Sequence, residues 1–90
     1  MNTEDIRQSI RELARANYHL YSDGFSYKPE GGELTEEEMN IAETVAEGYW
    51  DNRDEQEMKR DKELGITAED YCRWVVEAIR EAAIEKSNNF

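Results

Sequence analysis

The chain has 90 residues, with 22 Asp and Glu against 11 Lys and Arg, so its formal net charge is −11 at pH 7. This length supports one small domain with a modest core. Nucleic acid and anionic membranes are polyanions, so the charge argues against direct binding to either. No apolar run has the roughly 18 residues of a membrane span, and the acidic sequence after Met1 is unlike a secretory signal. We expect a cytoplasmic location.

The first predicted helix covers about residues 3–21. Asn2 or Thr3 can cap its N-terminus, and apolar residues recur at helical spacing from Ile6 onward. Three arginines, at positions 7, 11 and 15, are expected on its outer side. The favoured continuation is helical up to Gly24. The alternative is a short β-hairpin around 19–28, turning at Asp23-Gly24.

The second predicted helix covers about residues 36–64. Thr35 and Glu38 have the spacing of a capping box, which places the helix start at Glu36. After Trp50 the apolar pattern fades into a highly charged stretch. Whether residues 51–64 stay helical or break near Asp51-Asn52 is open.

The third predicted helix covers about residues 68–86, after a second capping box made by Thr67 and Asp70. Its apolar residues span an arc of roughly 200° on the helical wheel, wider than one neighbouring helix would cover. Either two helices sandwich this one, or part of it meets a second subunit in a dimer. The predicted fold is therefore all-α, a three-helix domain over residues 1–86 with a disordered tail at 87–90 and a tendency to form homodimers.

Few residues suit catalysis. His19 is the only histidine and Cys72 the only cysteine, which excludes an intrachain disulfide. Cys72 lies on the apolar arc, where an inert thiol is expected. A calcium loop beginning at Asp51 would need glycine at its sixth position and glutamate at its twelfth, where Gln56 and Lys62 stand. We expect no enzyme activity, no metal site and no cofactor.

The negative charge is concentrated in one window. Residues 30–57 contain 11 acids and a single base, Arg53, which gives −10, whereas the remaining 62 residues contain 11 acids and 10 bases. On a continuous helix, five of these acids fall within roughly 80° of one another and extend over about 27 Å. They are Glu36, Glu43, Glu47, Asp51 and Asp54.

Other residues extend this acidic stripe. Glu30, Glu33 and Glu37 thicken it, and Tyr49 and Trp50 lie at its border, where aromatic anchors would suit an interface. Like charges four residues apart disfavour a helix by a few tenths of a kcal/mol per pair. Because no lysine is interleaved, the stripe is predicted to contact a basic partner.

In length, isoelectric point, helical character and acidic block, the chain resembles the small acidic inhibitors of phages and mobile elements, such as anti-CRISPR and DNA-mimic antirestriction proteins. The resemblance implies an inhibitor that occupies the nucleic-acid channel of a defence complex in the bacterial host cytoplasm. Its stripe acids would then meet Lys and Arg of that channel. Two alternatives remain open: an antitoxin or adaptor that binds through apolar and aromatic surface, and a dimeric assembly protein whose acidic face is merely solvated.

Overall fold

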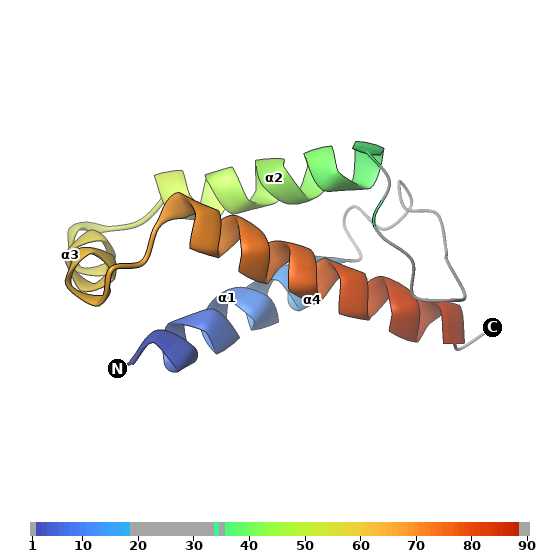
Figure 1. Ribbon diagram of the computed structural model, residues 1–90, viewed down its shortest axis with the longest axis horizontal. Coiled ribbons are helices and arrows are strands. Elements are labelled where there is room, and N and C mark those ends of the chain that lie inside the picture. The colour runs from blue at the N-terminus through green and yellow to red at the C-terminus, as the bar shows by residue number, and fades with distance from the viewer. Residues whose placement is uncertain (1, 19–33, 35, 89–90) are drawn as a thin grey trace.

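The computed structural model describes residues 2–18, 34 and 36–88, except for the side chains of residues 37 and 86–88. Within these residues the chain forms four helices and no strand (Figure 1). They are α1 (Thr3–Asn17), α2 (Glu36–Asp51), α3 (Glu55–Leu64) and α4 (Ala68–Asn88). The predicted all-α class is confirmed. None of these described helices is long and apolar enough to cross a membrane.

The first helix begins with a capping box. The Asn2 side chain accepts a hydrogen bond from the Asp5 amide at 2.9 Å, and the Asp5 carboxylate accepts one from the Asn2 amide at 3.3 Å. α1 ends at Asn17, with Tyr18 as its C-cap. The rest of the predicted helix and the alternative hairpin at 19–28 lie outside the described residues.

The helix predicted over residues 36–64 is interrupted after Asp51, which answers the question left open for residues 51–64 in favour of a break. The Gly48 carbonyl accepts hydrogen bonds from both the amide and the side chain of Asn52, and Arg53 Nε donates to the Trp50 carbonyl at 2.8 Å. These contacts satisfy carbonyls at the end of α2. Asp54 then opens α3 with a capping box of its own, accepting from the Glu57 amide at 2.8 Å. Two short helices therefore replace the long one.

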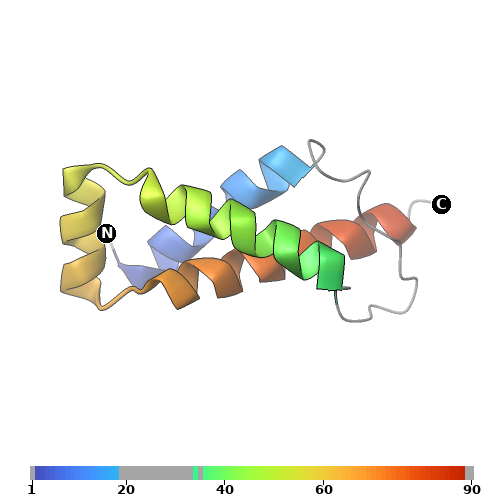
Figure 2. The ribbon, with the colours of Figure 1, turned by 90° about the horizontal axis from the view of Figure 1, so that it is seen from above.

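α3 ends where the sequence places a glycine. Gly65 has φ of 72°, in the left-handed region that favours glycine at a helix C-terminus. In Figure 2, α3 crosses the end of the helical layer instead of extending α2 into solvent. The connection leads directly into α4.

The fourth helix starts at Ala68, as the Thr67–Asp70 capping box predicts. The Asp70 carboxylate accepts from the Thr67 amide at 2.9 Å, and the Asp70 amide donates to Thr67 Oγ1 at 3.3 Å. α4 continues to Asn88, two residues beyond its predicted end. The backbone of Ser87 and Asn88 is therefore helical, and the predicted disordered tail at 87–90 is wrong for these two residues.

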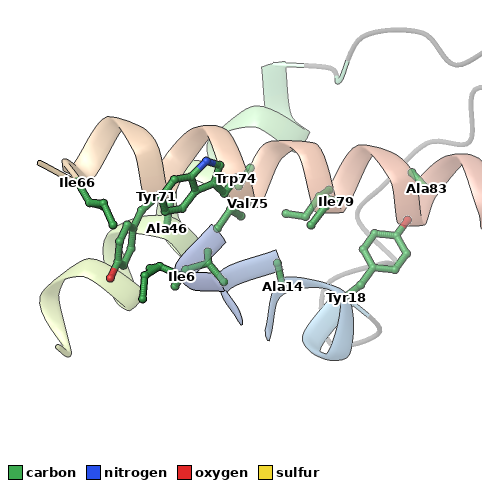
Figure 3. Packing of buried hydrophobic residues seen from close by; sticks show 13 residues of the cluster. Ile6, Ala14, Tyr18, Ala46, Ile66, Tyr71, Trp74, Val75, Ile79 and Ala83 are labelled. Atoms are coloured by element: carbon green, nitrogen blue, oxygen red, sulfur yellow. The ribbon is translucent and has the colours of Figure 1, made fainter. Parts of the chain in front are cut away.

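The core lies along α4, which packs against both α1 and α2 and runs between them in Figure 1. Tyr71, Val75 and Ile79 of α4 are almost fully buried, as is Ile6 of α1 (Figure 3). Several buried positions at the helix contacts are alanines: Ala14, Ala42, Ala46, Ala78 and Ala83. Of the two predicted explanations for the wide apolar arc, the sandwich between two helices is confirmed. The arc therefore supplies no separate argument for a dimer.

Ion pairs join α1 to α4 along their length. Arg7 pairs with Glu77 at 3.0 Å, Arg11 with Glu77 and Glu81, and Arg15 with Glu81 and Glu85. Both residue numbers increase together, so the two helices run parallel. The prediction places these arginines on the outer side of the helix, whereas the structure places them against α4, only partly exposed. Each pair is partly exposed and contributes at most about 1 kcal/mol, but together the pairs neutralise the arginines of α1.

Replacing Gly48 by alanine is expected to stabilise the protein. A Cβ atom at this helical position meets nothing within 4 Å. Alanine is better than glycine inside a helix by about 0.5–1 kcal/mol, which corresponds to about 3–6 °C in melting temperature for a domain of this size. Gly65→Ala is the control and should lower the melting temperature, because alanine disfavours positive φ. A lower melting temperature for Gly48→Ala would contradict the described environment of α2.

Candidate functional site

Four of the predicted site residues form one exposed surface on α2. Glu36, Glu43, Glu47 and Asp51 are all exposed, and together we call them the acidic face. With a rise of 1.5 Å per residue, they extend over about 22 Å, and the last three stand about 6 Å apart. A DNA strand carries one phosphate per roughly 3.4 Å. The carboxylates of Glu43, Glu47 and Asp51 are therefore spaced within a factor of two of the phosphates of a nucleic-acid strand.

Of the other acids of the predicted stripe, Asp54 does not join this face. Asp54 belongs to the start of α3, where its carboxylate caps the helix. The break after Asp51 removes the continuous helix on which its predicted alignment depended. Glu30, Glu33 and the side chain of Glu37 lie outside the described part of the molecule.

The charge of the acidic face is not neutralised within the described residues. None of its four carboxylates forms an ion pair there, whereas arginines elsewhere do, among them Arg7, Arg11, Arg15, Arg53, Arg60 and Arg73. Arg53 is the only base among residues 30–57, and it forms no ion pair with the acidic face. Its guanidinium pairs with Asp61 at 3.0 Å.

The predicted aromatic anchors are mainly used inside the fold. Tyr49 is half-buried, and its hydroxyl accepts a hydrogen bond from Asn17 Nδ2 at 3.3 Å. The Trp50 ring packs edge-on against Tyr71, with centroids 5.2 Å apart, and carries the Arg53 guanidinium 3.3 Å from its centroid. These contacts join α1, α2 and α4, so both side chains stabilise the fold in addition to any role at an interface.

A buried carboxylate that sequence reasoning missed holds α3 in place. Asp61 is fully buried and accepts hydrogen bonds from Tyr71 Oη at 2.6 Å and from Arg53 Nη1 at 3.0 Å. Arg60 donates two more, from Nε at 3.0 Å and Nη2 at 2.9 Å. The Asp61 carbonyl also accepts from the Ile66 amide at 2.8 Å. Residues from the α2–α3 connection, α3 and α4 thus converge on one carboxylate.

The surroundings of Asp61 lower its own pKa and raise the pKa of Tyr71. Burial alone would raise the pKa of Asp61, but hydrogen bonds from Tyr71, Arg53 and Arg60 hold this pKa below its ordinary value. For Tyr71, burial raises the pKa of the hydroxyl, and the neighbouring Asp61 carboxylate raises it further. At neutral pH the phenol therefore donates to an ionised carboxylate.

This arrangement predicts a loss of stability in acid. The pKa of Asp61 is lower in the folded than in the unfolded chain. The ionised carboxylate therefore contributes its full share of the free energy of unfolding above about pH 4, and this share is lost as pH falls through the folded pKa. Urea unfolding between pH 7 and pH 2 should show a steeper acid loss for the natural chain than for Asp61→Asn. Equal slopes would contradict the ionised cluster.

A hollow lies between α2 and the first turns of α4, beside the acidic face. Its volume is about 210 Å³, and it is lined by Glu43, Ala46, Glu47 and Trp50 of α2 and by Ala68, Glu69 and Cys72 of α4. Cys72 is half-buried. Burial raises the pKa of its thiol, and the charges of Glu43 and Glu47 raise it further. The thiol is therefore protonated and poorly reactive at neutral pH, as its place on the apolar arc predicts.

The described residues contain no group of three His, Cys, Asp or Glu side chains arranged to hold a metal ion. His19 lies outside them. Comparison of the chain with protein-family models, curated proteins and solved structures found no match. The acidic face and the neighbouring hollow are the features of the described structure that bear on function.

Proposed function

We propose that this protein is a non-enzymatic inhibitor that binds the basic, nucleic-acid-binding surface of a host defence complex and blocks nucleic-acid access. The observation that carries the proposal is the acidic face of α2. Its carboxylates are exposed and without an ion pair in the described structure, while the arginines of α1 and Arg53 are paired elsewhere. A basic partner would supply the missing counter-charges.

The distribution of charge favours this proposal over a merely solvated surface. α1 and α4 interleave arginine and glutamate across their contact, so this chain does pair its charges where pairing serves the fold. On α2, Glu43, Glu47 and Asp51 instead repeat at four-residue spacing, which disfavours the helix slightly. A partner surface rich in Lys and Arg would offset the repulsion among these carboxylates and increase the rate of association.

The alternative is an antitoxin or adaptor that binds through apolar and aromatic surface. Such a partner would need a contiguous apolar patch. Among the described residues, the exposed large apolar side chains are Leu13 and Met58, which lie on different helices. Tyr49 and Trp50 are packed into the fold. The charge-based interaction is therefore the better supported of the two.

The test is capture of partners by tagged protein from a bacterial lysate that contains defence systems, followed by elution at rising salt and mass spectrometry. We expect a nucleic-acid-binding complex that elutes between about 0.15 and 0.5 M salt, because interactions between exposed charges are screened in this range. A partner that withstands high salt would contradict the proposal and favour the apolar alternative.

A further inference from the structure

The hollow between α2 and α4 is lined by both apolar and acidic residues. Ala46, Ala68 and Trp50 supply apolar surface, and Glu43, Glu47 and Glu69 also line the hollow. A cavity of about 150 Å³ is large enough for a benzene molecule. The hollow, at about 210 Å³, therefore has room for one long side chain.

The carboxylates of Glu43, Glu47 and Glu69 are available to a ligand. All three are exposed, and none forms an ion pair or side-chain hydrogen bond within the described residues. The charges of Glu43 and Glu47 also act on the thiol at the hollow, where they raise the pKa of Cys72. Their field therefore reaches into the hollow as well as out into solvent.

We infer that this hollow receives one arginine side chain of the basic partner. The methylene groups would cover the apolar lining while the guanidinium donates to carboxylates of the three glutamates. Arginine suits this place better than lysine, because a guanidinium is planar, more weakly hydrated and stacks on aromatic rings. The Trp50 ring already holds one guanidinium, that of Arg53, 3.3 Å from its centroid.

This inference rests on the proposed function and adds to it. A solvated acidic face attracts any cation, whereas a hollow of this size and lining selects one shape of side chain. The acidic face would supply long-range attraction, and the hollow would fix the register of the partner on α2 and α4.

The direct test is titration of the isotopically labelled full chain with N-acetyl-arginine amide, followed by NMR. The reporters are the backbone amides of Ala68 and Cys72 and the indole N–H of Trp50, with the buried Trp74 indole as an internal reference. We expect saturating shifts at the three reporters. The neutral isostere N-acetyl-citrulline amide should bind at least about fivefold more weakly, because it lacks the charge that the carboxylates recognise. Equal binding of the two probes, or shifts that do not saturate, would overturn the inference.

A variant separates the hollow from the acidic face. Ala68→Leu fills the hollow without changing charge, and Ala16→Leu makes the same change at an exposed position of α1. Ala68→Leu should weaken arginine binding at least about fivefold, since its side chain occupies the same space, while Ala16→Leu leaves it unchanged. Circular dichroism and thermal melting establish that both variants are folded. A second test combines Glu43→Gln with Glu69→Gln, which removes two negative charges at nearly constant volume and should also weaken arginine binding.

The two proposals fail in different ways. If Ala68→Leu binds arginine as the natural chain does, the inference about the hollow is wrong, and salt-sensitive capture of a partner can still support the proposed function. If arginine binds in the hollow but every captured partner withstands high salt, the hollow is an arginine site and the proposed inhibitor function is wrong.

Discussion

Reversing Glu43, Glu47 and Asp51 to lysine together is expected to weaken partner binding at least about 100-fold, because like charges would then oppose each other across the interface. The fold should survive the change. All three side chains are exposed and form no ion pair in the described structure, so no internal contact is lost. Three lysines repel one another about as three carboxylates do. The expected loss therefore belongs to the interface.

The matched control is a second triple reversal, at Glu12, Glu55 and Glu63. These glutamates are also exposed and form no ion pair among the described residues, but they lie on α1 and α3. The two triple variants have the same net charge. Titration calorimetry with the captured partner should show near-natural binding for the control and a large loss for the α2 variant. Equal losses would mean that net charge alone governs binding, and undiminished binding of the α2 variant would contradict a role for the acidic face.

Asp61→Asn is expected to lower the free energy of unfolding by about 3 kcal/mol, because it leaves buried charge without its partner. Arg53, Arg60 and Tyr71 all donate hydrogen bonds to the Asp61 carboxylate. In the variant, the NH2 group of asparagine would replace one acceptor oxygen and face these donors. The two guanidiniums are only partly exposed, at 10% and 25% of their side-chain surface, so water replaces the carboxylate incompletely. The melting temperature should fall by more than about 10 °C.

The control for this variant is Asp51→Asn, at an exposed aspartate that forms no ion pair within the described residues. It should change the free energy of unfolding by less than about 0.5 kcal/mol. Urea unfolding of both variants at pH 7 makes the comparison. A loss below 1 kcal/mol for Asp61→Asn would show that α3 is held by other contacts than the Asp61 cluster.

Local signals in the sequence predict much of the fold. The Thr67–Asp70 capping box gives the start of α4, because its two hydrogen bonds involve residues only three apart. The start of α2 at Glu36 and the sandwiching of α4 follow from short-range spacing and the width of the apolar arc. Asp54 and Glu57 also have capping-box spacing, and this local signal indicates the start of α3 after the break. The prediction of one helix over residues 36–64 did not take it into account.

Contacts between distant residues were harder to anticipate. Asp61 stands among charged neighbours, and nothing local distinguishes it from a solvated aspartate. Its burial depends on Tyr71, ten positions later and on another helix. The sequence contains a partial signal for the pairing of α1 arginines with α4 glutamates, because both series repeat every four residues. That repeat does not say which helices will lie side by side.

For the candidate site, the sequence predicted the acidic face but not the hollow. Exposure and four-residue spacing on α2 are local properties, so Glu43, Glu47 and Asp51 could be grouped from sequence. Glu69 and Cys72 join Glu43 and Glu47 only because α2 packs against α4. Asp54 was misplaced because its grouping assumed that α2 continued.

The most direct test of the central claim is competition between this protein and nucleic acid for the captured partner. Fluorescently labelled nucleic acid bound to that partner is titrated with this protein, and anisotropy is measured. If the acidic face occupies the nucleic-acid surface, anisotropy should fall to the value of free nucleic acid, and the Glu43, Glu47 and Asp51 reversal should not lower it. Anisotropy that stays high while this protein binds would show a ternary complex and contradict the account.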